Sequence, residues 1–309
     1  MKRSLFTLVL LCCIVSTAVA QQFLPLWSGN MPNSRGIVVR DSIARERIMQ
    51  VGTPAIHAYF PSKAENNGTA VLIIPGGGYV RLAYEVSGIA LAKWFNTMGV
   101  SAFVLQHRFP TSPDVEVSWK APLQDAQRAM RYIRAHAAEW GIDTTRIGVM
   151  GCSAGGHLSA SLATIPDDWS AVGDTLDAHS YRPNFAILIS PVISMADSIV
   201  HAGSRRALLG EMCDDAAMRH FFSLDHQVTS ATPPTLLLHA SDDKSVSSLN
   251  SVAFYKALKN AGVTQSSLHI FPMGRHAISL RRQPGSTALW PTIAEMWMEE
   301  VGVLVPLRY

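Results

Sequence analysis

Short apolar runs alternate with longer amphipathic segments along most of the chain. The short runs are rich in Val, Ile, Leu and Phe, and they predict buried strands at residues 71–74, 101–105, 146–150, 185–190, 235–240 and 267–271. The longer segments carry apolar residues at helical spacing and predict helices at residues 85–98, 121–140, 154–163 and 249–261, with a last helix from Pro291. This alternation favours an α/β fold, with a mostly parallel central sheet covered by helices on both faces.

Two stretches do not follow the alternation. Residues 21–51 contain prolines and glycines at short intervals and are predicted to be irregular. Residues 195–226 form the least regular part of the remainder, and we interpret them as a cap or lid over a binding site. The chain has no internal repeat, low-complexity tract or composition break, so we expect a single domain over residues 21–309.

The first twenty residues have the build of a secretory signal peptide. Lys2 and Arg3 precede an apolar run, and the small-x-small pattern at residues 18–20 predicts cleavage before Gln21. We therefore expect residues 1–20 to be a signal peptide and the protein to be exported, either periplasmic or secreted. The apolar run is too short to span a membrane comfortably, and no later stretch is long enough.

The cysteines bear on how the chain is processed and on whether it contains disulfides. Lipid attachment through Cys12 or Cys13 is an alternative to simple cleavage, but Leu11 is large where such processing requires a small residue. Without the leader the chain keeps Cys152 and Cys213. Two cysteines do not make a disulfide framework, so both are expected to be free, buried thiols.

Composition and charge exclude several classes of function. Of the 309 residues, 48% are hydrophobic and 16% are charged, which is enough apolar material for a sizeable core. The formal net charge is +3 and no basic block is present, so a nucleic-acid partner is not expected. The chain has no H-E-x-x-H, paired C-x-x-C, P-loop or G-x-G-x-x-G, so neither a metal nor an organic cofactor is expected. Nothing in the sequence indicates an oligomeric state.

The segment GCSAG at residues 151–155 matches G-x-S-x-G and lies between a predicted strand and a predicted helix. A sharp turn at such a place pushes the serine side chain out at the end of the sheet, so Ser153 is the candidate nucleophile. The alternative is a plain glycine-rich turn. Cys152 is a chemical rival, but in this geometry its side chain would point into the core.

A serine hydroxyl requires a base, and the base requires a carboxylate that orients it. In α/β-hydrolases, which carry their nucleophile in this motif, the acid and then the histidine follow later strands. His276 follows the strand at 267–271, and Asp242 and Asp243 follow the strand at 235–240. We favour Asp243, because it lies three residues before Val246 in the D-x-x-V spacing typical of the acid loop.

The other histidines need different explanations. His157 is expected to be packed or hydrogen-bonded on the helix after the nucleophile, and His239 is expected to lie in the core. His107 or His201 could line the pocket.

The tetrahedral oxygen of an acyl-transfer reaction requires two backbone N–H donors. One is expected from Ala154, directly after the nucleophile, and the other from the glycine turn at residues 75–79. Gly77 and Gly78 are the candidates there, because glycine allows the backbone to approach a ligand closely. The alternative is a flexible loop.

These segments resemble a known group of proteins. Residues 73–79 (IIPGGGY), 146–158 (RIGVMGCSAGGHL) and 242–246 (DDKSV), together with 182–193, 203–205 and 208–210, are similar to the bacterial esterase branch labelled acetyl xylan esterase or xylanase-like α/β-hydrolase, which is related to the BD-FAE and prolyl-oligopeptidase-like hydrolases. The resemblance covers about residues 24–301. It implies an α/β-hydrolase fold and removal of short acyl groups, chiefly acetyl, from sugars or polysaccharides.

The chain departs from that family at two positions. The family often has Gly-His-Gly around its histidine, where this chain has Arg275-His276-Ala277, and a proline where it has Ser247. No catalytic group is lost, but the substrate and the loop shape are left open.

Two other functions remain: a peptidase of the prolyl-oligopeptidase type, for whose extra domain the chain has no room, and a non-catalytic binding protein on the same scaffold.

Overall fold

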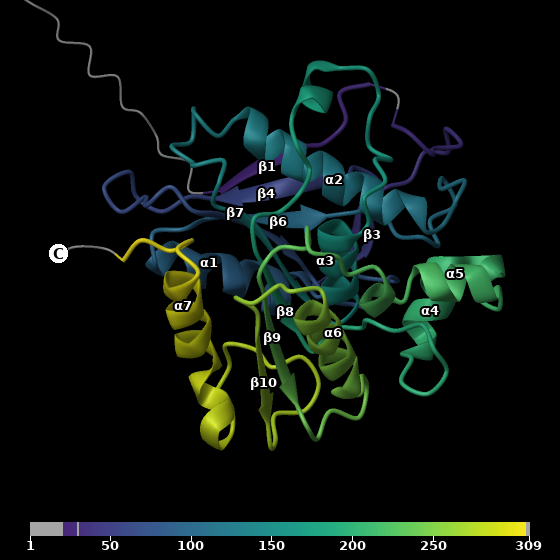
Figure 1. The fold of residues 1–309 in the computed structure, drawn as a ribbon. Helices are drawn as coiled ribbons and strands as arrows, with labels where there is room; N and C mark the ends of the chain where they lie inside the picture. The colour runs from purple at the N-terminus through teal and green to yellow at the C-terminus, as the bar shows by residue number, and fades with distance from the viewer. Residues whose placement is uncertain (1–20, 30, 307–309) are drawn as a thin grey trace, which may run out of the picture.

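The computed structural model describes residues 21–29 and 31–306 (Figure 1). The predicted signal peptide and Cys12 and Cys13 lie outside the described residues. The main sheet has eight strands in the order β1-β4-β6-β5-β7-β8-β9-β10. These are β1 (Gln21–Pro25), β4 (Ala55–Tyr59), β5 (Ala70–Ile74), β6 (Ser101–Gln106), β7 (Ile147–Cys152), β8 (Ala186–Ile189), β9 (Thr235–Ala240) and β10 (Ser267–Phe271).

All neighbours from β6 to β10 pair in parallel, whereas β4 is antiparallel to both β6 and β1. The predicted mostly parallel α/β sheet is therefore confirmed. In a parallel sheet the carboxyl ends of the strands share one edge, so the loops that follow β5, β7, β9 and β10 meet there.

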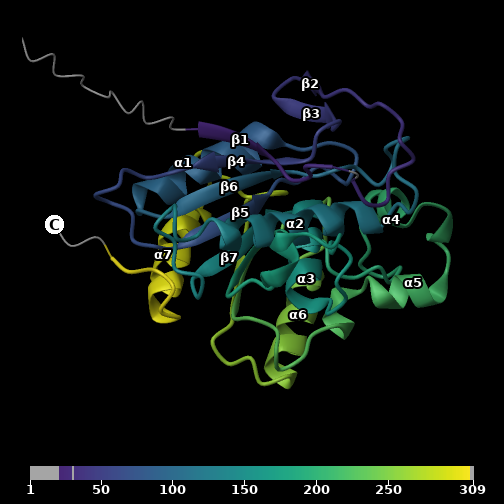
Figure 2. The ribbon, with the colours of Figure 1, turned by 90° about the horizontal axis from the view of Figure 1, so that it is seen from above.

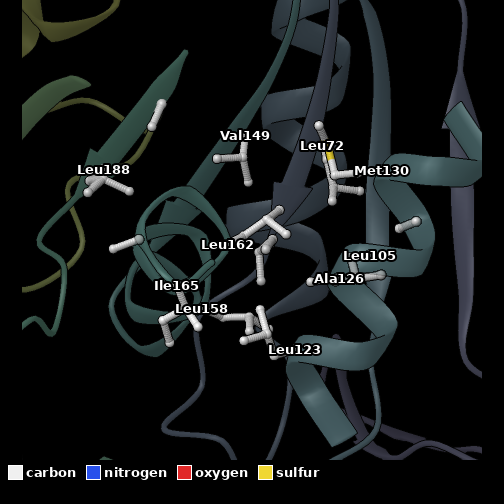
Figure 3. Close-up of a cluster of buried hydrophobic side chains, with 14 of the residues drawn as sticks. Leu72, Leu105, Leu123, Ala126, Met130, Val149, Leu158, Leu162, Ile165 and Leu188 are labelled. Atoms are coloured by element: carbon white, nitrogen blue, oxygen red, sulfur yellow. The ribbon is translucent and has the colours of Figure 1, made fainter. Parts of the chain in front are cut away.

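Alternate residues of the strands face opposite cores. Val71 and Ile73 of β5 pack in one buried cluster with the helices α1 (Ala90–Thr97) and α7 (Trp290–Glu300). Leu72 and Ile74 pack in a second cluster with α2 (Lys120–Ala135), α3 (Ala154–Thr164) and α6 (Leu249–Asn260). Figure 3 shows part of the second cluster, with Leu72, Leu105, Val149 and Leu188 of the sheet beside Leu158 and Leu162 of α3 and Leu123 and Met130 of α2. Burial on both faces explains why these strands read as continuous apolar runs.

The predicted helices are present, with two changes of extent. The segment predicted as a helix at residues 85–98 is a π-helical turn (Glu85–Ile89) followed by α1. The helix predicted at 121–140 ends at Ala135, because His136 leaves helical geometry and the chain closes in a turn, with Ile142 N–H donating to Ala137 O at 2.8 Å.

The prediction that residues 21–51 are irregular is wrong. Residues 21–25 form the edge strand β1, and β2 (Ser42–Ala44) and β3 (Arg47–Gln50) form a separate antiparallel hairpin, seen beside the main sheet in Figure 2. The hairpin is tied to the loop after β5, because Ile48 and Leu82 exchange backbone hydrogen bonds of 3.1 and 2.9 Å. Ile48, Val51, Leu82 and Phe109 bury one another in a small cluster of their own.

The segment at residues 195–226 consists of short helices joined by loops. It contains α4 (Ala202–Leu209), α5 (Ala216–Phe221) and two short 3-10 turns, Gly210–Met212 and Leu224–His226. Across the described residues, no helix is both long and apolar enough to cross a membrane.

Candidate active site

Ser153 sits at the sharp turn between β7 and α3. Its backbone has φ 56° and ψ −122°, a conformation that a side chain normally disfavours. The flanking residues must be glycine here. A Cβ at Gly151 would lie 2.3 Å from Gly155 O, and a Cβ at Gly155 would lie 2.2 Å from Ile74 O. The sharp turn predicted from the G-x-S-x-G pattern is present, and close backbone packing requires its glycines.

The structure brings together the three side chains that the sequence singles out. His276 Nε2 lies 2.9 Å from Ser153 Oγ, and His276 Nδ1 lies 2.7 Å from Asp243 Oδ2. Asp243 is an acceptor in this geometry, so Nδ1 carries the proton and donates to it, and Nε2 is left to accept from the serine hydroxyl. Such a tautomer is what a general base for a serine requires.

The carboxylate of Asp243 is held on both oxygens. Oδ1 accepts from the backbone N–H groups of Ser245 and Val246 at 2.9 and 3.0 Å, which explains the D-x-x-V spacing. Burial by itself would raise the pKa of this carboxyl, but hydrogen bonds from His239, His276 and the Val246 backbone outweigh it and hold the pKa well below its usual range. Asp243 is therefore ionised at neutral pH.

Asp242 has a different contact. Its Oδ1 accepts the backbone N–H of Arg275 at 2.8 Å, so it holds the loop that carries His276 rather than the imidazole itself.

His239 has a contact that sequence reasoning missed. The side chain is fully buried, as predicted, but its Nε2 lies 3.3 Å from Asp243 Oδ2 and 3.0 Å from Val246 O. Ser251 Oγ lies 2.8 Å from Nδ1 and can donate to it, which leaves the proton on Nε2. The signal in the sequence is the spacing H-x-x-x-D, which places a histidine at the end of β9 under the acid loop.

The glycine turn after β5 lies against the nucleophile. A Cβ at Gly76 would be 3.2 Å from Ser153 Cβ, and a Cβ at Gly77 (φ +146°) would be 2.0 Å from Arg81 O. Within the described part of the chain, the backbone N–H groups of Gly77, Gly78 and Ala154 have no acceptor. Free donors beside the nucleophile are what an oxyanion-binding site requires.

A pocket of about 420 Å³ opens over Ser153 and His276. Its walls come from the glycine turn, the π-helical turn, the two loops that carry Asp243 and His276, the β2–β3 hairpin and the start of α4: Arg47, Gly76, Gly77, Gly78, Val80, Arg81, Ala83, Val86, Ser87, Leu91, Cys152, Ser153, His201, Gly203, Ser245, His276, Ala277, Ile278 and Ser279. The volume is typical of a small-molecule site.

His201 and His107 are the two histidines predicted as possible pocket-lining residues. His201 lines the pocket, as one of the two alternatives proposed, and brings the segment at 195–226 to its wall. His107 is buried and does not line it.

Two buried groups near the nucleophile have structural roles. Cys152 is 2% exposed within the apolar cluster under the sheet, and burial raises the pKa of its thiol to about 12, which removes it as a rival nucleophile.

His157 is packed and hydrogen-bonded, as predicted. Its Nδ1 lies 2.8 Å from Tyr79 Oη and its Nε2 2.9 Å from Phe222 O, and burial lowers its pKa to about 4.

Cys213 is free, as expected, but half-buried rather than buried. Among the described residues, no group of three or more His, Cys, Asp or Glu side chains is arranged to hold a metal ion.

The loop around His276 keeps a glycine-like backbone without glycine. Arg275 and Ala277 both have positive φ, 61° and 53°, at the two positions where the resembling family often has glycine. The departure noted in the sequence therefore changes the side chains and leaves the backbone in the left-handed region, where a Cβ costs about 1–2 kcal/mol.

Replacing Ala277 with glycine should therefore stabilise the protein. We expect Ala277→Gly to raise the free energy of unfolding by about 1 kcal/mol in urea titration, because the left-handed strain is relieved. The matched control is Ala261→Gly, at φ −81°, which should lower it by about 0.5 kcal/mol. A loss of stability in Ala277→Gly equal to that of the control would contradict the strain argument.

The fold defines a class, that of the α/β-hydrolases. Residues 56–258 match the BD-FAE family model, and the chain belongs to the BD-FAE family. The chain is 34% identical over 213 residues to an acetylxylan esterase of Xylanibacter ruminicola and 35% identical over 210 residues to endo-1,4-beta-xylanase B of Butyrivibrio fibrisolvens. Both matches cover 68% of this chain, but only 41% and 32% of the two relatives.

A solved structure extends the comparison to nearly the whole chain. The acetyl ester-xyloside bifunctional hydrolase of Caldicellulosiruptor lactoaceticus superposes with a TM-score of 0.77 at 35% identity, covering 92% of this chain and 97% of that one. The resemblance inferred from the motifs is confirmed, and two of these three relatives, the acetylxylan esterase and the acetyl ester-xyloside hydrolase, are named as acting on esters.

Proposed function

We propose that this protein is an exported serine esterase that removes short acyl groups, chiefly acetyl, from carbohydrate or polysaccharide esters. The observation that carries the proposal is the hydrogen-bonded chain from Ser153 through His276 to Asp243, placed at the floor of an open pocket. The names of the relatives, an acetylxylan esterase and an acetyl ester-xyloside hydrolase, support the acetyl group and the sugar.

In the first step Ser153 Oγ attacks the ester carbonyl carbon while His276 Nε2 accepts the serine proton. Asp243 keeps the imidazole in its productive tautomer and stabilises the imidazolium that forms. The negative carbonyl oxygen faces the backbone N–H groups of Gly77 or Gly78 and of Ala154, whose donors are free in the described part of the chain. His276 then gives the proton to the departing alkoxide, which leaves as an alcohol.

In the second step water attacks the acyl-enzyme. His276 Nε2 accepts a proton from the water, the same N–H groups bind the new oxyanion, and the bond between the acyl carbon and Ser153 Oγ breaks. The proton returns to Ser153 and a carboxylic acid is released.

Export is proposed from the leader sequence. Lys2, Arg3 and the apolar run that follows support removal of residues 1–20 at the membrane, with residues 21–309 folding as one domain outside the cytoplasm. Acylated polysaccharides are too large to enter a cell, so an enzyme that acts on them directly would need such a leader.

A substrate panel tests the activity. We expect hydrolysis of aryl acetate and release of acetate from acetylated xylan, with kcat/KM for an aryl octanoate at least about tenfold lower than for the acetate, because a site fitted to a short acyl group discriminates by about 1–3 kcal/mol per methylene. Acetate release by a coupled assay and aryl release by absorbance measure both. Cleavage of aminoacyl-anilides with no ester hydrolysis would contradict the proposal and favour a peptidase.

A further inference from the structure

The charged side chains that line the active-site pocket are all basic. Its lining includes two arginines, Arg47 and Arg81, and no aspartate or glutamate. The nearest carboxylate of the catalytic chain, Asp243, lies behind His276 and accepts from its Nδ1. A substrate that enters this pocket therefore meets guanidinium groups and hydroxyls but no negative side chain on the walls.

The two arginines are not engaged by the protein. Both are exposed, and within the described residues neither side chain forms an ion pair or a hydrogen bond. Two carboxylates, Glu46 and Glu85, line a neighbouring hollow that shares Val86 with the pocket, and they do not line the pocket itself. By contrast, the buried Arg108 is paired with Asp125 at 2.9 Å.

Local structure fixes the backbone positions of Arg47 and Arg81. Arg47 opens strand β3, next to Ile48, whose backbone exchanges hydrogen bonds with Leu82. Arg81 directly precedes Leu82, and its Cγ lies 3.1 Å from the position of a Cβ at Gly77, so its stem runs along the glycine turn. One backbone bridge thus brings both residues to the same rim of the pocket.

We propose that Arg47 and Arg81 form a cationic subsite that binds a carboxylate carried by the ester substrate. A guanidinium offers a planar fork of N–H donors that matches a carboxylate in geometry and charge. The inference rests on the proposed esterase function and narrows its substrate class to acidic esters. The carboxylate can belong to the alcohol side, as in an acetylated uronic acid, or to the acyl side, as in a hemisuccinate.

Two matched substrate pairs distinguish these sources. The first pair is an O-acetylated methyl glucuronoside and the same compound with its carboxylate replaced by a carboxamide. The second pair is 4-nitrophenyl hemisuccinate and its neutral succinamate. In each pair the ester is the same and only the charge differs, so the ratio of the two kcat/KM values isolates recognition of the carboxylate.

The variants are Arg47→Gln and Arg81→Gln, alone and together. The control is Arg45→Gln, which removes the same charge from the same hairpin at an exposed position outside the pocket. We expect wild type to prefer the acidic member of one pair by about tenfold, the magnitude of one charged hydrogen bond. The double variant should lose this preference, mainly through KM, so that its kcat/KM values for the two members of the pair become equal. Arg47→Lys should keep part of it, and added salt should weaken it.

The outcomes separate the subsite from the esterase. Equal rates within both pairs by an active wild type would overturn the subsite and leave the esterase proposal standing, as would a preference that survives in the double variant. A loss in Arg45→Gln as large as in Arg47→Gln would also overturn it, because the effect would then belong to general surface charge. No hydrolysis of any ester by the folded wild type would overturn both proposals together.

Discussion

Replacing Ser153 with alanine should reduce ester hydrolysis by about four to six orders of magnitude, the loss seen when a serine nucleophile is removed from such a triad. The substitution removes only the side-chain hydroxyl, whose Oγ lies 2.9 Å from His276 Nε2. Alanine keeps the backbone N–H groups of the elbow and adds no bulk, so the pocket should retain its shape and still bind substrate.

The measurement is kcat on an aryl acetate, beside circular dichroism and a thermal melt. Ser153→Ala should melt within a few degrees of wild type, since only one hydroxyl is lost. Ser230→Ala, an exposed serine elsewhere on the surface, serves as the handling control and should match wild type. Retention of more than about a hundredth of wild-type activity by well-folded Ser153→Ala would mean that another group attacks the ester.

Asp243→Asn should lower kcat by about ten-thousandfold, as the equivalent change does in serine proteases. An amide nitrogen facing His276 Nδ1 can only donate, so it forces the imidazole proton onto Nε2, where it blocks acceptance from Ser153. The backbone N–H groups of Ser245 and Val246 can still bind the amide oxygen, so the loop should keep its shape.

Asp242→Asn is the matched control, one residue away. Among the hydrogen bonds of the described residues, its carboxylate accepts just the Arg275 backbone N–H, and an amide oxygen can accept the same bond. We expect less than a tenfold loss of kcat in this variant. Similar losses in the two variants, or the larger loss in Asp242→Asn, would reverse the assignment of the acid.

Much of this site could be predicted because the constraints on it are local. The sharp turn at Ser153 requires glycine two residues before and two residues after it, so the five residues 151–155 are enough to predict the turn. The acid and the base follow buried strands, and strand ends in a parallel sheet meet at one edge, so chain order was enough to bring His276 to a serine 123 residues away.

The features that sequence reasoning missed depend on pairing between distant segments. Strand β1 pairs with β4, and the β2–β3 hairpin is short and held by Leu82, so neither has a hydrophobic pattern long enough to be recognised. The hairpin nevertheless supplies Arg47 to the pocket. His239 was correctly placed in the core, but its contact with Asp243 depends on how the acid loop folds back over the end of β9.

The helix boundaries show a second limit. Residues 136–140 continue the apolar spacing of α2, yet the chain leaves the helix at His136. The rings of Tyr132, His136 and Trp140 stack on one another there, with centroids 4.3 and 5.1 Å apart along the series. This arrangement buries the same side chains without a continuing helix, so periodicity alone could not find the end.

Labelling with a fluorophosphonate tests the central claim most directly, because the reagent reacts only with a serine that a working base has activated. Treatment of the folded protein, followed by digestion and mass spectrometry, should give one adduct, on Ser153. The adduct should be absent after denaturation, in Ser153→Ala, and when Asp243→Asn is treated for the same short time. A folded protein that hydrolyses esters but carries no adduct, or carries it on another residue, would contradict the account.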